Sequence, residues 1–88
     1  MHAVVVRVTI NQPDQTLEQL RNQVVPSVSQ APGFVAGYWT WSGRENGLSM
    51  AVFESEDAAR QMADRVPQMV PEFVTLDSVE VREVVASA

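Results

Sequence analysis

The chain has no cysteine, no lysine and a single histidine, His2, among its 88 residues. Without cysteine, neither a disulfide nor a thiolate metal site can stabilise the fold. One histidine is too few for a histidine-based zinc site, and we expect His2 to be frayed because it lies at the chain end. The glycines form no phosphate-binding loop, and no Ser-His-Asp set can form around His2 alone. The sequence therefore predicts neither a metal nor a cofactor.

Positive charge is also scarce. All six basic residues are scattered arginines, and the formal net charge is −5. Nucleic-acid binding needs clustered positive charge, and anionic membrane surfaces disfavour an acidic protein. The N-terminus lacks a basic leader, and no apolar run approaches the ~20 residues of a membrane-spanning helix. We therefore expect a cytoplasmic protein with neither nucleic acid nor membrane as a partner.

Apolar residues make up 45% of the chain, which is typical of a globular protein. A chain of this length forms one domain, residues 1–88, and buries only about 60–65% of its unfolded surface. With no disulfide or metal to stabilise so small a core, oligomerisation is the usual remaining source of stability.

The hydrophobic pattern alternates between strand and helix periods. Strands are expected at Ala3–Ile10, Gly33–Ser42, Leu48–Glu54 and Val74–Val85. One helix is expected over about 15–25, because Pro26 should kink the helix or end its regular part, and a looser turn follows to Gln30. A second helix runs from its cap Ser55 to Pro67. The order β-α-β-β-α-β predicts an α+β, ferredoxin-like fold: a four-stranded antiparallel sheet with two helices on one face.

The two central strands of the pattern form a hairpin with aromatic side chains. A two- or four-residue loop would place odd positions of one strand beside even positions of the other, so Trp39 and Trp41 would share a face with Met50 and Val52. We assign the helices to the opposite face, which would carry the small Ser49 and Ala51. Both faces are then substantially apolar, which marks an interface. The sequence predicts a homodimer whose sheets pack face to face, with its interface at Trp39, Trp41, Met50 and Val52.

The remaining aromatic side chains would lie beneath the helices. Tyr38, Phe34 and Phe53 are therefore the expected contacts of a small aromatic or apolar ligand, with the Tyr38 phenol as hydrogen-bonding group. Tyr38 could equally satisfy itself with a local partner. For the two tryptophans, a stacking platform for a flat ligand is the alternative to interface packing.

Four segments carry a family resemblance: V-V-V-R-V-T-I in the first strand, V-V-P-S-V around Pro26, P-G-F at Pro32–Phe34, and A-V-F-E-S-E-D-A-A at Ala51–Ala59. With these segments the chain resembles the antibiotic-biosynthesis-monooxygenase-like group of the dimeric α/β-barrel superfamily. The resemblance covers nearly the whole chain and implies that two copies form a dimeric α/β barrel. Some relatives oxygenate aromatic polyketides without a cofactor, some degrade heme, and others have no known activity.

Only some of the functional residues of those relatives have a counterpart in this sequence. Heme-degrading members use an Asn, a Trp and a His; the first two positions are similar to Val8 and Phe53 here, and the second helix has no His. The resemblance therefore implies no heme degradation. Quinone-forming members use Asn, Trp and Tyr, and Tyr38, Trp39 and Trp41 supply two of these types without a positional match. Two hypotheses follow: a cofactor-independent monooxygenase-like protein, or a non-enzymatic binding or assembly module whose aromatics form the dimer interface.

Overall fold

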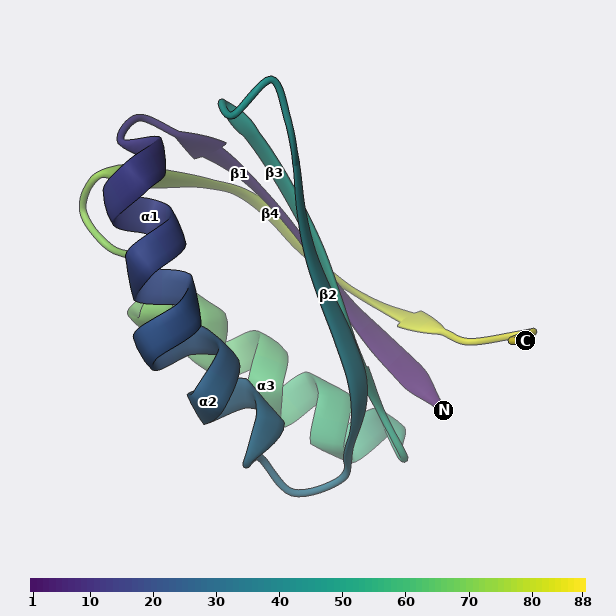
Figure 1. The fold of residues 1–88 in the computed structure, drawn as a ribbon. Helices are drawn as coiled ribbons and strands as arrows, with labels where there is room; N and C mark the ends of the chain where they lie inside the picture. The colour runs from purple at the N-terminus through teal and green to yellow at the C-terminus, as the bar shows by residue number, and fades with distance from the viewer.

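The computed structural model describes every residue from Met1 to Ala88 and has two layers, a sheet and helices on one of its faces (Figure 1). Its elements are β1 (His2–Ile10), α1 (Pro13–Gln19), the π-helical turn η1 (Leu20–Val24), α2 (Val25–Ser29), β2 (Phe34–Ser42), β3 (Asn46–Phe53), α3 (Glu56–Met69) and β4 (Val74–Glu83). The sheet is antiparallel in the order β2-β3-β1-β4. This confirms the ferredoxin-like fold class.

Both helical segments continue beyond the prolines that they contain. The first continues past Pro26 to Ser29, so Pro26 does not end the helix, and of the two expectations the structure shows the distorted helix. The wider turn η1 comes directly before it, and Pro26 then falls in the first turn of α2, where a missing N–H costs little. Pro67 likewise does not end α3, which continues to Met69 because Pro67 already lies in its last turn. No helix of the structure is both long and apolar enough to cross a membrane.

The β2–β3 hairpin decides which side chains share a face. Its loop has three residues, Gly43, Arg44 and Glu45, between the paired Ser42 and Asn46. The first two adopt positive φ, at 65° and 64°. An odd-numbered loop pairs odd positions with odd positions, so the expected two- or four-residue loop, and the faces derived from it, are wrong.

Corrected faces follow from this register. Trp39 lies opposite Ser49 and Trp41 opposite Gly47, on the face that carries the helices, here called the helix face. Tyr38 lies opposite Met50 on the other face, here called the open face. The prediction that Ser49 and Ala51 face the helices is confirmed, but Trp39 and Trp41 join them there.

A bulge explains why Phe34 is on the same side as the tryptophans. Phe34 pairs with Phe53 and Ala36 pairs with Val52, so Val35 is the extra residue in β2. Phe34 therefore stays on the helix face despite its even number. Its ring meets that of Phe53 edge to face, with centroids 5.9 Å apart.

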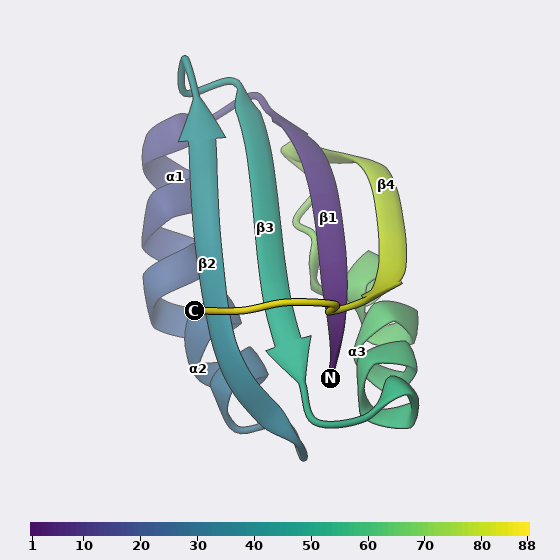
Figure 2. The same ribbon diagram turned by 90° about the vertical axis from the view of Figure 1, so that its right-hand side faces the viewer.

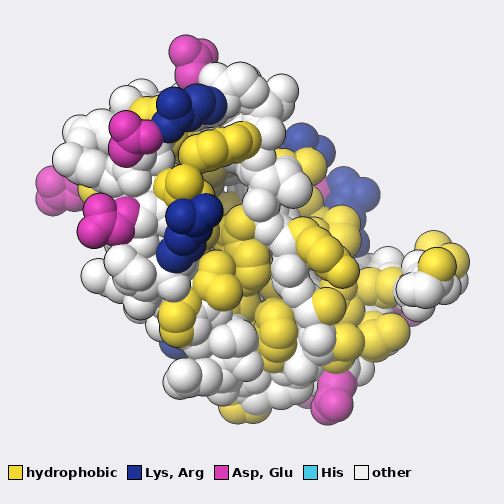
Figure 3. All heavy atoms as spheres, viewed as in Figure 1, with side chains coloured by type: hydrophobic (Ala, Val, Ile, Leu, Met, Phe, Trp, Pro, Cys, Tyr) yellow, Lys and Arg dark blue, Asp and Glu magenta, His cyan; other side chains and the backbone are white.

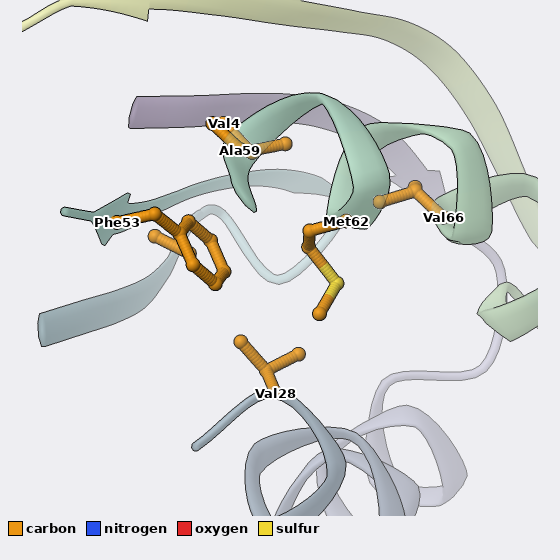
Figure 4. Close-up of a cluster of buried hydrophobic side chains, with 7 residues drawn as sticks. Val4, Val28, Phe53, Ala59, Met62 and Val66 are labelled. Carbon is orange, nitrogen blue, oxygen red and sulfur yellow. The ribbon is translucent and has the colours of Figure 1, made fainter. Parts of the chain in front are cut away.

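The hydrophobic core lies between α2, α3 and the sheet. Figure 4 shows Val28 of α2 and Met62 of α3 pointing toward each other, with Phe53 of β3 beside them. The buried cluster consists of Val4, Val28, Ala51, Phe53, Ala59, Met62 and Val66. His2 is part of the sheet, paired with Phe53 and Glu83, so the expectation that it is frayed is wrong.

The open face is uncovered in this chain (Figure 2). Tyr38, Leu48 and Met50 are 67%, 40% and 44% exposed there. The β4 edge of this face is charged, with an Arg82–Glu80 ion pair. The last residues leave β4 on the side of the sheet away from the helices (Figures 1 and 2).

Candidate functional site

A cavity of about 520 Å³ lies between the first helical segment and the sheet, and is here called the helix–sheet cavity. Helix α3 packs on β1 and β4, and α2 packs against β2, whereas α1 makes few close approaches to the sheet. The space under α1 therefore stays open. Figure 3 shows hydrophobic side chains filling the hollow between the helices and β2, with basic groups at its border.

The walls of the cavity come from two apolar stripes. The helix period brings Leu17, Leu20 and Val24 to its helical side. Strand alternation brings Val4, Val6, Val8 and Ile10 of β1 to its sheet side. Met62 and Val66 of α3 close its inner end, where it meets the core.

Both tryptophans line this cavity. A Cβ on Gly37 would lie 2.9 Å from the Trp39 ring, so the indole lies directly over the glycine backbone. Gly47, opposite Trp41, leaves similar room, since a Cβ there would approach Val8 to 2.6 Å. The two glycines thus allow aromatic rings and aliphatic side chains to lie low against the sheet, which leaves the cavity open above them.

One ion pair connects the hairpin loop to the start of α1 at the Trp41 end of the cavity. The Arg44 guanidinium contacts the Asp14 carboxylate at 2.5 Å. It also lies 5.4 Å from the centre of the Trp41 ring. Both charged groups are exposed, so the ion pair contributes only about 0–1 kcal/mol. Arg44 thus lies between the start of α1 and Trp41 at this end of the cavity.

Few polar groups reach the cavity. Its lining residues contain no histidine, aspartate, glutamate or tyrosine, and its single charged residue is Arg21. Thr16 is buried, and its hydroxyl has no hydrogen-bond partner. No three His, Asp or Glu side chains converge on a point that could hold a metal ion. The site can bind and shield an apolar molecule, and it has no obvious general base.

The ligand contacts expected from the sequence do not line the cavity. Phe53 is fully buried in the core and, with Phe34, lies toward the other end of the sheet. Tyr38 is on the open face and exposed, so its expected position under the helices is wrong. Thr16 and Arg21 line the cavity although the sequence analysis does not name them as site residues. The signal for both was the stripe Leu17–Leu20–Val24, which they flank at helical spacing.

The chain is similar to known proteins in its fold but not in its sequence. No protein-family model matches the chain, and no curated protein matches it in sequence. Solved structures do match. SnoaB, a cofactor-independent oxygenase from Streptomyces nogalater, is similar with a TM-score of 0.76 at 16% identity, over 98% of this chain and 94% of SnoaB. HapK from Hahella chejuensis has a TM-score of 0.78 at 9% identity, over 100% of this chain and 96% of HapK.

A third match is a mutant of MhuD with two manganese protoporphyrin IX molecules bound per active site, with a TM-score of 0.62 at 19% identity, over 98% of this chain and 97% of MhuD. MhuD is a heme-degrader from Mycobacterium tuberculosis. Identities this low show a shared fold and not a shared reaction. At the level of the fold, the resemblance read from the sequence is confirmed: the chain has the same fold as SnoaB, HapK and MhuD.

Proposed function

We propose that this protein binds a flat, apolar aromatic molecule in the helix–sheet cavity and oxygenates it without a cofactor. The observation that carries the proposal is an apolar cavity of about 520 Å³ lined by both Trp39 and Trp41. Apolar pockets of this volume typically bury most of the surface of a small ligand. The unpaired Thr16 hydroxyl favours a ligand that carries an oxygen. The similar fold of a cofactor-independent oxygenase supports the choice of reaction.

The chemistry is limited by what the cavity contains. With no side chain in the lining that can act as a general base, the substrate must itself be acidic enough to lose a proton to solvent. An anthrone illustrates the class: its methylene carbon loses a proton, and the carbanion then reduces molecular oxygen and captures it as a peroxide. Loss of water from the peroxide gives the ketone. One anthrone and one dioxygen thus give one anthraquinone and one water. The protein excludes bulk water and holds the ring system against the indoles.

Oxygen consumption with anthrone as substrate, followed together with the absorbance of anthraquinone, tests the reaction. Binding is measured separately by quenching of tryptophan fluorescence with anthraquinone. We expect saturable quenching and a rate above the spontaneous one, both reduced in Trp39→Ala. Tyr38→Phe, on the open face, is the matched aromatic control and should leave both unchanged. Absence of saturable quenching would contradict the proposal.

A non-enzymatic binding module is the second candidate, and the lack of a general base in the cavity favours it. Its signature is saturable anthraquinone binding with no acceleration of anthrone oxidation. The version of this hypothesis in which the tryptophans form the dimer interface is not supported, because both line the cavity.

Breakdown of heme is not part of the proposal. The chain's single histidine does not line the cavity. The positions similar to the heme-degraders' Asn and Trp hold Val8 and Phe53. Titration with hemin in the presence of a reductant tests this point, and saturable binding with turnover would overturn it.

We also propose a homodimer formed through the open face, which retains Met50 and Val52 from the predicted interface. Tyr38 and Leu48 lie on the same face and are exposed, as a self-complementary apolar surface requires. Val85, in the segment that leaves β4 on this side, is 86% exposed. A cytoplasmic location stays a prediction from the sequence.

A further inference from the structure

The helix–sheet cavity has an uncompensated positive charge. Arg21 is its single charged lining residue, in a protein whose net charge is −5. The ion pairs of the structure involve Arg44, Arg60 and Arg82, and Arg21 belongs to none of them. Arg21 itself is exposed, so it lies where the cavity opens to solvent. An anion that enters the cavity can pair with the guanidinium there, beside apolar walls that screen the charge less than open water does.

Neighbouring acidic groups do not satisfy this charge. Glu18, one helical turn before Arg21, belongs to a shallow depression on the other side of α1, with Gln15 and Asn22. Asp14, at the start of α1, is already paired with Arg44. Glu18 precedes Arg21 by three residues, a spacing at which helix side chains can meet, but the two form no ion pair in the structure.

We infer that the ligand of this cavity is an aromatic monoanion, whose ring system lies against Trp39 and Trp41 and whose carboxylate or phenolate oxygen pairs with Arg21. The inference rests on the proposed function, since it names the class of molecule that the same cavity takes. Apolar walls alone would bind a neutral aromatic molecule as well as an anionic one. The Arg21 guanidinium, the single charged group of the cavity lining, adds a preference for negative charge. Its planar geometry suits a carboxylate.

Two probes that differ only in charge test this inference: 2-naphthoate and the neutral 2-naphthamide. Their dissociation constants are measured by calorimetry for the wild type and for Arg21→Gln, Arg21→Lys and Arg65→Gln. Arg65 is the matched control, because it is exposed on α3, outside the cavity lining and outside the ion pairs. The indole N–H signals of Trp39 and Trp41 in NMR spectra report whether each probe enters the cavity.

For the wild type we expect 2-naphthoate to bind about tenfold tighter than 2-naphthamide, a preference that declines as salt screens the charge. Arg21→Gln should abolish the preference while changing the 2-naphthamide affinity by less than about twofold. Arg21→Lys should retain part of the preference, and Arg65→Gln all of it.

Equal binding of the two probes to the wild type, or an unchanged preference in Arg21→Gln, would overturn the inference and leave the proposed binding function standing. If neither probe binds and neither indole signal moves, both the inference and the proposed function fail. The two failures are therefore distinguishable in one series of titrations.

Discussion

At the scale of single residues, the cavity depends on the absence of a side chain at Gly37. The Trp39 ring lies where a Cβ would come within 2.9 Å of it, and the Phe34 ring is also close, at 3.3 Å. Neither ring is the end of a flexible chain that can move aside cheaply. A methyl group here would push the indole toward the cavity, where it would take space from a ligand.

We therefore predict that Gly37→Ala weakens anthraquinone binding and lowers the free energy of unfolding by about 1–3 kcal/mol, the usual cost of overpacking. Chemical denaturation measures the stability, and fluorescence quenching measures the binding. The double variant Gly37→Ala/Trp39→Phe should recover part of the stability, because the smaller ring makes room for the methyl group. A Gly37→Ala protein as stable as the wild type, with unchanged binding, would show that the indole does not depend on this glycine.

Glu56 shows a second effect that belongs to one residue. Hydrogen bonds from Arg60, at 2.7 and 3.2 Å, and then its positive charge, hold the pKa of the Glu56 carboxyl below the usual 4.5. Because the folded-state pKa is lowered, the contribution of this pair to stability is present above the unfolded-state pKa. It is lost as the pH falls through the folded-state pKa.

We expect Arg60→Gln to raise the pKa of Glu56 toward its usual value, which carboxyl ¹³C NMR titration would measure directly. Arg65→Gln removes the same charge from the same helix without touching the pair, and it should leave the Glu56 titration where it is. If the Glu56 pKa were the same in Arg60→Gln and the wild type, the helix N-terminus rather than Arg60 would be its cause.

At the scale of secondary-structure elements, α3 is fixed at its beginning by a side chain. Ser55 has extended backbone geometry, and its hydroxyl accepts a hydrogen bond from the Ala58 N–H at 3.1 Å. This is the N-cap that the sequence predicts. Because α3 supplies Ala59, Met62 and Val66 to the core, loss of the cap affects the element that holds the sheet and helices together.

Ser55→Ala should lower the free energy of unfolding by about 1 kcal/mol, the typical contribution of a serine N-cap. Urea denaturation followed by circular dichroism gives the value. Ser27→Ala, at an exposed position of α2 without a capping role, is the control and should change stability by less than about 0.5 kcal/mol. Equal effects of the two substitutions would refute a specific capping role for Ser55.

Element order was predictable from the sequence, whereas the assignment of side chains to sheet faces was not. Hydrophobic periodicity and helix caps indicate where strands and helices lie, and this assignment stays correct when a boundary is misplaced by one or two residues. A face assignment does not, because a change of one residue in the hairpin loop moves every side chain of one strand relative to the other. The Gly43–Glu45 loop and the bulge at Val35 are two such changes.

The same sensitivity explains the candidate site. With the faces exchanged, Tyr38 was expected in the cavity and Trp39 and Trp41 outside it, the reverse of their positions. The helical side of the site follows a pattern that no loop interrupts, so the helical spacing of Leu17, Leu20 and Val24 is enough to indicate it. What the stripe could not show was that α1 stands away from the sheet and leaves a cavity rather than a packed core.

At the scale of the whole molecule, the chain buries little of itself. Only 12 of its 88 residues are buried, and much of the apolar surface of the sheet faces outward. A core this small, without disulfides, usually needs further burial to be stable. The open face provides it over β2 and β3, where Tyr38, Leu48 and Met50 are exposed. Arg7 of β1 and the Arg82–Glu80 pair of β4 make the other half of this face charged. The dimer we propose would thus centre on β3.

We therefore predict that the wild type has twice the chain mass of 9.7 kDa in light scattering, and that Met50→Glu converts it to a monomer. Met50 is 44% exposed, so the monomer itself tolerates the charge, whereas a dimer would have to bury it without a partner. Gln61→Glu adds the same charge at an exposed position of α3 and should remain dimeric. A monodisperse wild-type monomer would contradict the open-face dimer. A Met50→Glu protein that stays dimeric would place the interface elsewhere on the molecule.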